Sequence, residues 1–233
     1  AESHAEEAVI AARQAGDGFS LAQAYMMLAI AHFFKGELPL GREYAELGLS
    51  TSLSANFPPA MHLAHITLSL IEAITGNTLA AEQQLEASIP LVANPYQEML
   101  TNWAAAVALC ARREFDAATE KAMAVIGVAQ AGQMPNFIAA VLPVIATSLA
   151  GRDDPALAAE LLALALAQPR SATGWLTNWP LIAQLRSDLE QTLGAQAFAE
   201  AWERGEALEI PQAVSALDML NVQQTHPEEV ANH

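Results

Sequence analysis

The chain has 233 residues, of which 53% are hydrophobic and 15% charged, and it carries a net charge of −16. This composition excludes disorder over most of the length, and so acidic a surface argues against direct contact with nucleic acid or anionic lipid. The longest apolar run, which begins at Phe137, falls short of the roughly 20 residues that a membrane-spanning helix needs. A single cysteine, Cys110, allows no internal disulfide and fits a cytoplasmic protein.

The first 17 residues have the pattern of one amphipathic helix, and four longer units follow it. The units align at four positions, with successive offsets of 40, 37 and 38 residues: Gly36, Gly76, Arg113 and Gly151. An apolar segment of helical length precedes each position, and a more amphipathic segment follows it. In the first unit the second segment has Gly41, Ala45 and Gly48 on one helical face, which allows a neighbouring helix to approach closely. Each unit is therefore predicted to be a helix, a tight turn and a second, antiparallel helix.

Helix pairs that repeat every 34 to 47 residues or so cannot bury their apolar faces alone, so we expect them to stack. The predicted fold class is all-α, a right-handed α-α superhelix, or solenoid, with a short helical C-terminal cap. Breakers such as Pro58-Pro59 and Pro135-Asn136 place a half repeat at 1–17 and units at about 20–54, 58–93, 95–131 and 135–168. Because the half repeat lacks its first helix, we expect the domain to begin upstream of Ala1.

The cap is predicted at 169–220, because the last unit of a solenoid needs a solvated outer face. Gly194 and Gly205 divide it into helices at about 178–193, 195–206 and 210–220. The polar stretch 221–233 is expected to be a flexible tail. Before the cap, Asp153 and Asp154 precede Pro155, which is typical of a capped helix N-terminus rather than an acid–base pair.

Motifs for catalysis are missing from the sequence: there is no P-loop, HExxH, paired CxxC, GxSxG or GxGxxG. We therefore expect no enzymatic activity, no metal and no cofactor. His62 and His65, one helical turn apart, could hold zinc if a further ligand came from elsewhere, but packing beside a helix face is the favoured interpretation. His32 takes a position typical of the core, and Cys110 lies in an apolar segment that favours a buried, unreactive thiol.

One surface is a candidate binding site. If the first helices line the concave side of the stack, the three- and four-residue steps place nine apolar side chains there: Met26, Ile30, Phe33, Ile66, Leu70, Trp103, Val107, Val141 and Ile145. An apolar wall of that extent is typical of a site for a protein or peptide partner, or for a small apolar ligand. The pattern also fits helices that are buried all round, in the core or in a homodimer, and we favour that packing over a ligand groove.

The units resemble tetratricopeptide repeats (TPR), which have a large, a small and a bulky residue in the first helix and small residues in the second. The residues that carry this resemblance in the first and third units are Leu28, Ala29, His32, Gly41, Gly48, Ala106, Leu109, Phe115 and Ala118. The resemblance covers roughly residues 1–168 and implies a TPR-like solenoid that serves protein–protein interaction.

The sequence LGAQAFAEAWERGEALEIPQAV, residues 193–214, resembles the end of the helical-repeat region in large bacterial regulators. These are signal-transduction ATPases and transcriptional regulators with LuxR-type or SARP-type DNA-binding domains. The resemblance implies a non-catalytic regulatory module of a larger transcriptional or signalling protein, which binds a protein or ligand. The alternative is a stand-alone TPR-like scaffold for the assembly of protein complexes.

Overall fold

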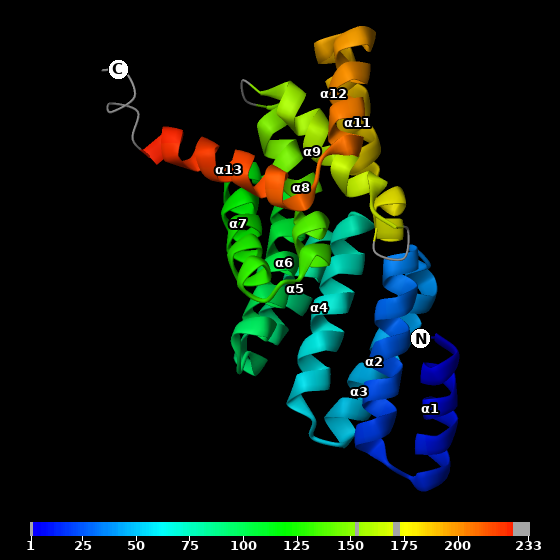
Figure 1. The fold of residues 1–233 in the computed structure, drawn as a ribbon. Helices are drawn as coiled ribbons and strands as arrows, with labels where there is room; N and C mark the ends of the chain where they lie inside the picture. Colours follow the sequence, from blue (N-terminus) through cyan, green and yellow to red (C-terminus); the bar gives the residue numbers. More distant parts are fainter. Residues whose placement is uncertain (1, 152–153, 170–172, 226–233) are drawn as a thin grey trace.

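The computed structural model describes residues 2–151, 154–169 and 173–225. In these ranges the chain forms twelve α-helices, two short 3₁₀-helices and no strand, which confirms the predicted all-α class (Figure 1). The elements are α1 (Glu2–Ala15), α2 (Gly18–Lys35), α3 (Leu38–Ser54), α4 (Pro58–Ile74), α5 (Thr78–Ser88), η1 (Ile89–Leu91), α6 (Pro95–Ala111), α7 (Phe115–Ala131), α8 (Pro135–Ala150), α9 (Pro155–Ala167), η2 (Gly174–Asn178), α11 (Pro180–Leu193), α12 (Ala195–Ala207) and α13 (Ile210–Thr225).

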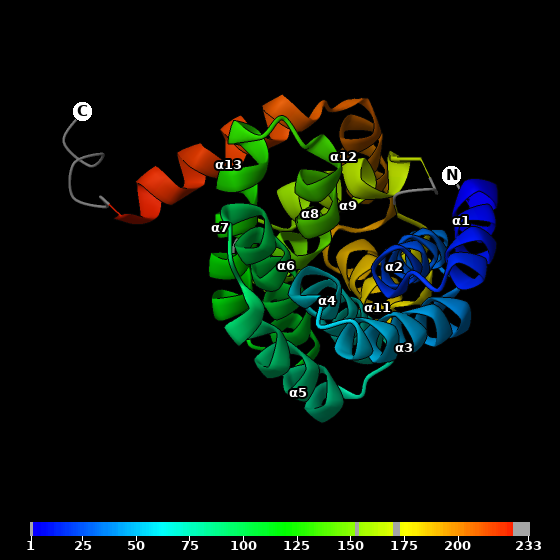
Figure 2. The ribbon, with the colours of Figure 1, turned by 90° about the horizontal axis from the view of Figure 1, so that it is seen from below.

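Helices that follow one another along the chain pack side by side from α1 to α9, and α2, α4, α6 and α8 also contact one another in that order. Figure 2 shows α3, α5 and α7 on the outside of this array and α2, α4, α6 and α8 nearer its centre. We call the latter four helices the inner layer. None of the helices in the described ranges is long and apolar enough to cross a membrane.

Six turns between consecutive helices share one backbone design. In each, the first or second residue after the helix has a positive φ, and the next N–H donates to the carbonyl five residues earlier, as from Glu37 N to His32 O at 2.9 Å. The first four of these positions are spaced by 20 residues, and so are the last two: Gly16, Gly36, Asn56, Gly76, Arg113 and Gln133. The repeat in the sequence therefore corresponds to helices of similar length that end in the same way. Gly151, the fourth aligned position, differs, with a φ of −86°.

At the turn glycine Gly76 there is room for a side chain, but we expect its backbone conformation to be unfavourable for any residue that has one. Its φ is +86°, and a Cβ atom built there would meet no heavy atom within 4 Å. Gly76→Ala should therefore lower the unfolding free energy by about 1 kcal/mol, because only the left-handed conformation is penalised. Gly127→Ala is the matched control, since this glycine lies inside α7 with equally open surroundings, and alanine there should raise stability by about 1 kcal/mol. Urea unfolding measures both changes, and shifts of the same sign would contradict this account of the turn.

Small residues on α3 allow it to lie close to α2, as their spacing predicts. A Cβ atom on Gly41 would be 3.3 Å from the backbone of α2 at Ala29 O and Phe33 N. A Cβ atom on Gly48 would be 2.5 Å from Met26 Sδ, and Ala45 between them is fully buried. The face that Met26 presents to α3 is therefore occupied by packing within the first helix pair.

The C-terminal helices pack against α9 and α8. A Cβ atom on Gly205 of α12 would lie 2.3 Å from Glu160 O of α9, so these two helices touch backbone to backbone. At the start of α9, Asp154 Oδ1 accepts a hydrogen bond from Leu157 N at 3.1 Å, which confirms the predicted cap, while Asp153 lies outside the described residues. Helix α13 continues to Thr225, into the stretch predicted as a flexible tail, and residues 226–233 also lie outside the described part.

A short segment connects this C-terminal part to the beginning of the array. We call η2, Gly174–Asn178, the strap; it lies beside the end of α2 (Figure 1). Asn178 Nδ2 donates to Gly36 O at 2.8 Å. Gly36 and Gly174 meet without side chains, because a Cβ atom on Gly36 would lie 2.6 Å from Gly174 O and one on Gly174 would lie 2.6 Å from Lys35 O. Residues far apart in sequence are thus held in contact at a point where only glycine fits.

Candidate functional site

An apolar cavity opens on the inner layer. Its volume of about 130 Å³ is close to the roughly 150 Å³ that accommodates one benzene molecule in a protein interior. Five of the nine side chains predicted for the inner wall lie here together: Ile30, Phe33, Ile66, Leu70 and Trp103. With them, Phe34, Leu63, Thr67, Tyr96, Leu100 and Phe137 complete the lining of what we call the inner-wall cavity.

The cavity has a buried floor and a partly exposed rim. Phe33 and Trp103 on the floor are at most 3% exposed, whereas Tyr96 on the rim is 48% exposed. Partial burial raises the pKa of the Tyr96 phenol above its usual value, so the hydroxyl is protonated at neutral pH. Ile30 and Leu63 are also partly exposed. A ligand could therefore enter past a mixed aliphatic and aromatic rim and reach a buried floor.

An aromatic cluster around Trp103 shapes the floor. The Trp103 ring is 5.9 Å from the Phe34 ring in a stacked arrangement, and 6.0 Å and 5.8 Å from the Phe33 and Phe137 rings in edge-to-face arrangements. Such geometries add to the stabilisation from burial alone. Trp175 of the strap joins the cluster, 6.0 Å from Trp103, although it does not line the cavity. The aromatic part of the lining therefore comes from α2, α6 and α8, and the strap supports it.

The lining offers little polar chemistry. Among the described residues that form it, none carries a charge. The Thr67 hydroxyl donates to Leu63 O of its own helix at 2.8 Å, and the indole Nε1 of Trp103 is buried without a hydrogen-bond partner. No nucleophile with an adjacent base can be assembled from these groups. The lining is suited to contact with an apolar ring or a branched aliphatic chain.

The other four predicted wall residues lie in the core. Met26 packs against Gly48 of α3 rather than facing the cavity. The remaining three are at most 2% exposed and belong to the same buried cluster as Trp175: Val107, Val141 and Ile145. These three side chains do not line the inner-wall cavity, so the predicted apolar stripe borders this cavity only nearer the first helix pair.

Apart from Ile30, sequence reasoning missed the rim. Phe34 directly follows Phe33, while Tyr96 and Phe137 lie in the first turns of α6 and α8. Their rings come from helix faces adjacent to the predicted stripe, because a cavity at the junction of several helices draws on more than one face of each. The rim could have been inferred from one feature of the sequence: aromatic residues lie near the start of the first helix in two successive units.

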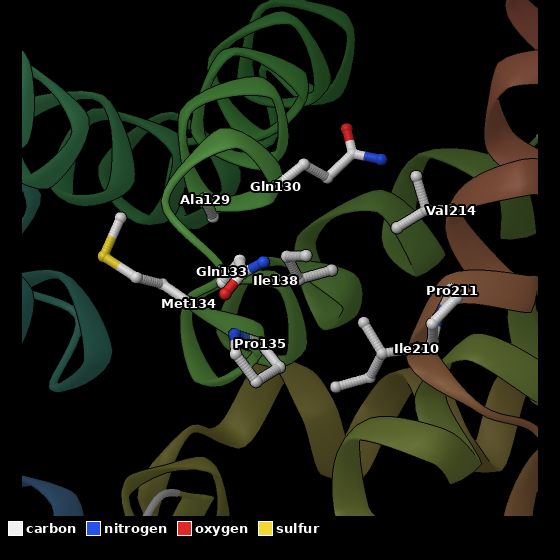
Figure 3. Close-up of a pocket in the computed structure, with 9 residues that line it drawn as sticks. All are labelled: Ala129, Gln130, Gln133, Met134, Pro135, Ile138, Ile210, Pro211 and Val214. Atoms are coloured by element: carbon white, nitrogen blue, oxygen red, sulfur yellow. The ribbon is translucent and has the colours of Figure 1, made fainter.

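A second, wider hollow lies between the α7–α8 turn and the start of α13 (Figure 3). Its volume is about 490 Å³, and its lining is Ala129, Gln130, Gln133, Met134, Pro135, Ile138, Ile210, Pro211 and Val214. Figure 3 shows Pro135 and Ile138 on the α8 side, with Ile210 and Val214 on the α13 side. Both glutamines are exposed, so the hollow is an open apolar groove with amide groups at its surface.

His62 and His65 serve packing and hydrogen bonding. His62 Nε2 lies 3.0 Å from Thr101 Oγ1, whose hydroxyl proton goes to Gln97 O, so Nε2 is the protonated nitrogen. His62 Nδ1 is then a buried acceptor without a partner, and burial, with a smaller effect of His65, lowers the pKa of His62 to about 4. His65 Nδ1 donates to Gln84 Oε1 at 2.7 Å. The part of the chain that the structure describes has no group of three or more possible metal ligands among His, Cys, Asp and Glu.

The two other singled-out side chains are core residues, as predicted. His32 is 6% exposed, with its Nδ1 2.5 Å from Glu37 Oε2 and its ring stacked on Tyr44. Cys110 is fully buried with its Sγ 3.2 Å from Thr147 Oγ1, and burial raises the pKa of the thiol to about 11. The thiol is therefore protonated at physiological pH and is not a reactive nucleophile.

No protein-family model matches the chain, and neither the curated proteins nor the solved structures give a match. Its class is defined by its own geometry: an all-helical array, compatible with a helical repeat, with an apolar cavity on its inner layer.

Proposed function

We propose that this chain is a non-catalytic binding module whose inner-wall cavity receives a small apolar group of about the size of one ring. In this proposal the helix pairs belong to a right-handed, TPR-like superhelix, and the cavity lies on its concave side. The observation that carries the proposal is that four consecutive inner-layer helices contribute side chains to a single uncharged hollow with a solvent-exposed rim. Preformed apolar pockets of this kind are the usual sites of small-ligand binding.

The size of the cavity limits what it binds. A ligand of six non-hydrogen atoms gains at most about 9 kcal/mol, so its dissociation constant is expected to be no lower than roughly micromolar. Tighter binding requires a larger ligand or peptide that inserts one ring and continues over the rim at Tyr96. Both uses depend on the same apolar floor.

Filling the entrance should weaken ligand binding. Ile30→Phe enlarges a partly exposed rim side chain, and we expect it to weaken benzene binding at least tenfold because the added ring occupies the mouth. Ile10→Phe is the matched control, since Ile10 is 58% exposed on α1 and does not line the cavity. Titration with benzene, followed by NMR shifts of the tryptophan indole N–H groups, measures both. Failure of the wild-type protein to bind benzene would overturn the proposal.

We further propose that the module is part of a larger bacterial regulator in the cytoplasm, in which an occupied cavity biases a neighbouring ATPase domain. The support is the resemblance of residues 193–214 to the end of such helical-repeat regions. The encoding gene provides the test: a reading frame that joins this segment to a P-loop ATPase and a DNA-binding domain supports the regulatory role. A frame that joins it to neither contradicts that role and leaves the binding proposal unchanged.

A stand-alone scaffold for protein complexes is the second candidate, and the open groove beside α13 favours it. The volume of this groove, about 490 Å³, is larger than that of the inner-wall cavity, and the groove could accommodate a polypeptide segment. A photocrosslinking residue at Gln133 would contact a partner bound there, while one at Tyr96 would contact a partner at the cavity rim. With a purified partner protein, crosslinking at Gln133 that benzene does not reduce supports the scaffold.

A further inference from the structure

The strap supports the cavity floor without lining the cavity. Trp175 is fully buried, and its ring stacks on Phe33 at 5.6 Å with an interplanar angle of 22°. It also meets Trp103 edge-on, at 6.0 Å and 70°. Phe33 and Trp103 both belong to the floor. Any movement of Trp175 therefore changes the support of the two rings that a ligand would touch.

The strap is held to α2 by one side-chain hydrogen bond and by the close approach of two glycine backbones. Asn178 Nδ2 donates to Gly36 O at 2.8 Å, and the backbones of Gly36 and Gly174 meet where neither tolerates a Cβ atom. The Thr177 hydroxyl donates to Gly174 O of the strap itself at 2.7 Å. A single methyl group at Gly36 is thus enough to push the strap away from α2.

Closure of the strap also has an opposing contribution. The Nε1 atoms of Trp175 and Trp103 are both buried without a hydrogen-bond partner. A buried donor without an acceptor has lost its hydrogen bond to water and forms none within the protein, which disfavours the closed arrangement. When the strap opens, Trp175 Nε1 can bond to water. Stacking favours closure and the unpaired N–H groups oppose it, so a further contribution from a ligand can shift the balance.

We propose that the strap and the inner-wall cavity are thermodynamically linked, with Trp175 as a positioning residue. A ligand in the cavity holds Phe33 and Trp103 in place and thereby keeps the strap closed against α2. When the strap is released, these rings can move and the cavity binds the ligand more weakly. Because linkage is reciprocal, the factor by which closure strengthens binding equals the factor by which binding favours closure. This inference rests on the proposed binding function of the cavity.

Two glycine variants separate the strap from general stability. Gly36 and Gly76 have nearly the same backbone conformation, with φ of +82° and +86°, but only at Gly36 would a Cβ atom meet the strap. Gly36→Ala should accelerate hydrogen exchange of the amides of residues 174–178 at least tenfold and raise the dissociation constant for benzene at least tenfold. Gly76→Ala, which has the same backbone cost, should change both by less than twofold. In the wild-type protein, saturating benzene should slow exchange in the strap.

Asn178→Ala provides a milder variant, because it removes the hydrogen bond to Gly36 O without introducing a clash. It should change strap exchange and benzene affinity in the same direction as Gly36→Ala and by smaller factors. If Gly36→Ala opens the strap but binds benzene as tightly as Gly76→Ala does, the linkage is wrong and the binding function stands. If benzene does not bind the wild-type protein, the binding function and the linkage both fail.

Discussion

Replacing Trp175 by alanine should lower the unfolding free energy by about 3–5 kcal/mol, the usual range for removing a large aromatic side chain from a packed core. Trp175 is fully buried and contacts the rings of Phe33, Trp103 and Trp179 at centroid distances of 5.6 Å to 6.0 Å. Its loss would leave a void between the strap and the inner layer. Urea unfolding followed by far-ultraviolet circular dichroism measures the effect.

Trp175→Phe and Trp202→Ala are the controls for this result. Phenylalanine keeps a ring in the stack and removes the buried Nε1 that has no partner, so Trp175→Phe should cost less than half as much as Trp175→Ala. Trp202 of α12 is partly exposed and packs on Phe198 and Arg186 near the surface. Its replacement by alanine should cost about 1 kcal/mol, in the range of exposed aromatic and cation–π contacts. Equal losses at Trp175 and Trp202 would show that the strap contributes little to the core.

Acidification should destabilise the protein through His62 before most carboxylates titrate. Burial holds the pKa of His62 at about 4 in the folded chain, whereas its ordinary value is 6.5. Above pH 6.5 the imidazole is neutral in both states and the titration contributes nothing. As the pH falls from 6.5 towards 4, the unfolded chain binds a proton that the folded chain does not, so stability decreases. A pKa difference of this size corresponds to about 3 kcal/mol at most.

The comparison with His62→Gln isolates this contribution. Glutamine can still donate to Thr101 Oγ1, the hydroxyl that His62 Nε2 contacts at 3.0 Å, but it does not titrate. Carboxylates such as Glu72, whose pKa is lowered chiefly by its hydrogen bond with Arg42, lose their contribution in both proteins at lower pH. The unfolding free energy of the wild-type protein should therefore fall more steeply between pH 6.5 and 4 than that of His62→Gln. Parallel profiles would mean that His62 is protonated without penalty in the folded state.

Helix content and helix ends could be predicted because their signals are local. Helices predicted at about 178–193 and 195–206 are found at Pro180–Leu193 and Ala195–Ala207. Proline, glycine and the spacing of apolar residues act within one or two turns, so they are legible without knowledge of distant contacts. The burial of Cys110 and the cap at Asp154 follow from local sequence for the same reason. The turn at Arg113 was predicted from the repeat, but its positive φ of +65° could not be, because arginine has no preference for the left-handed conformation.

The site was predicted in part. Periodicity placed Ile30, Phe33 and Ile66 on one side of the first helices, and these side chains do meet around one cavity. The same periodicity could not distinguish them from Val141 and Ile145, which are equally apolar and equally spaced, and are buried, but do not line the cavity. Helical spacing specifies a direction around one helix axis, and it contains no information on what lies opposite.

The sequence by itself determined an all-helical chain, the turns that end its helices and the apolar face of its inner layer, since each depends on residues close together along the chain. Tertiary structure alone decided which part of that face is core and which part is hollow. The contacts that hold the strap beside this face join Gly36 to Gly174 and Asn178, and the hydrogen bond among them spans 142 residues. A contact of that range depends on how all the intervening helices stack, because their summed packing brings the strap to the end of α2 and seats Trp175 behind Phe33.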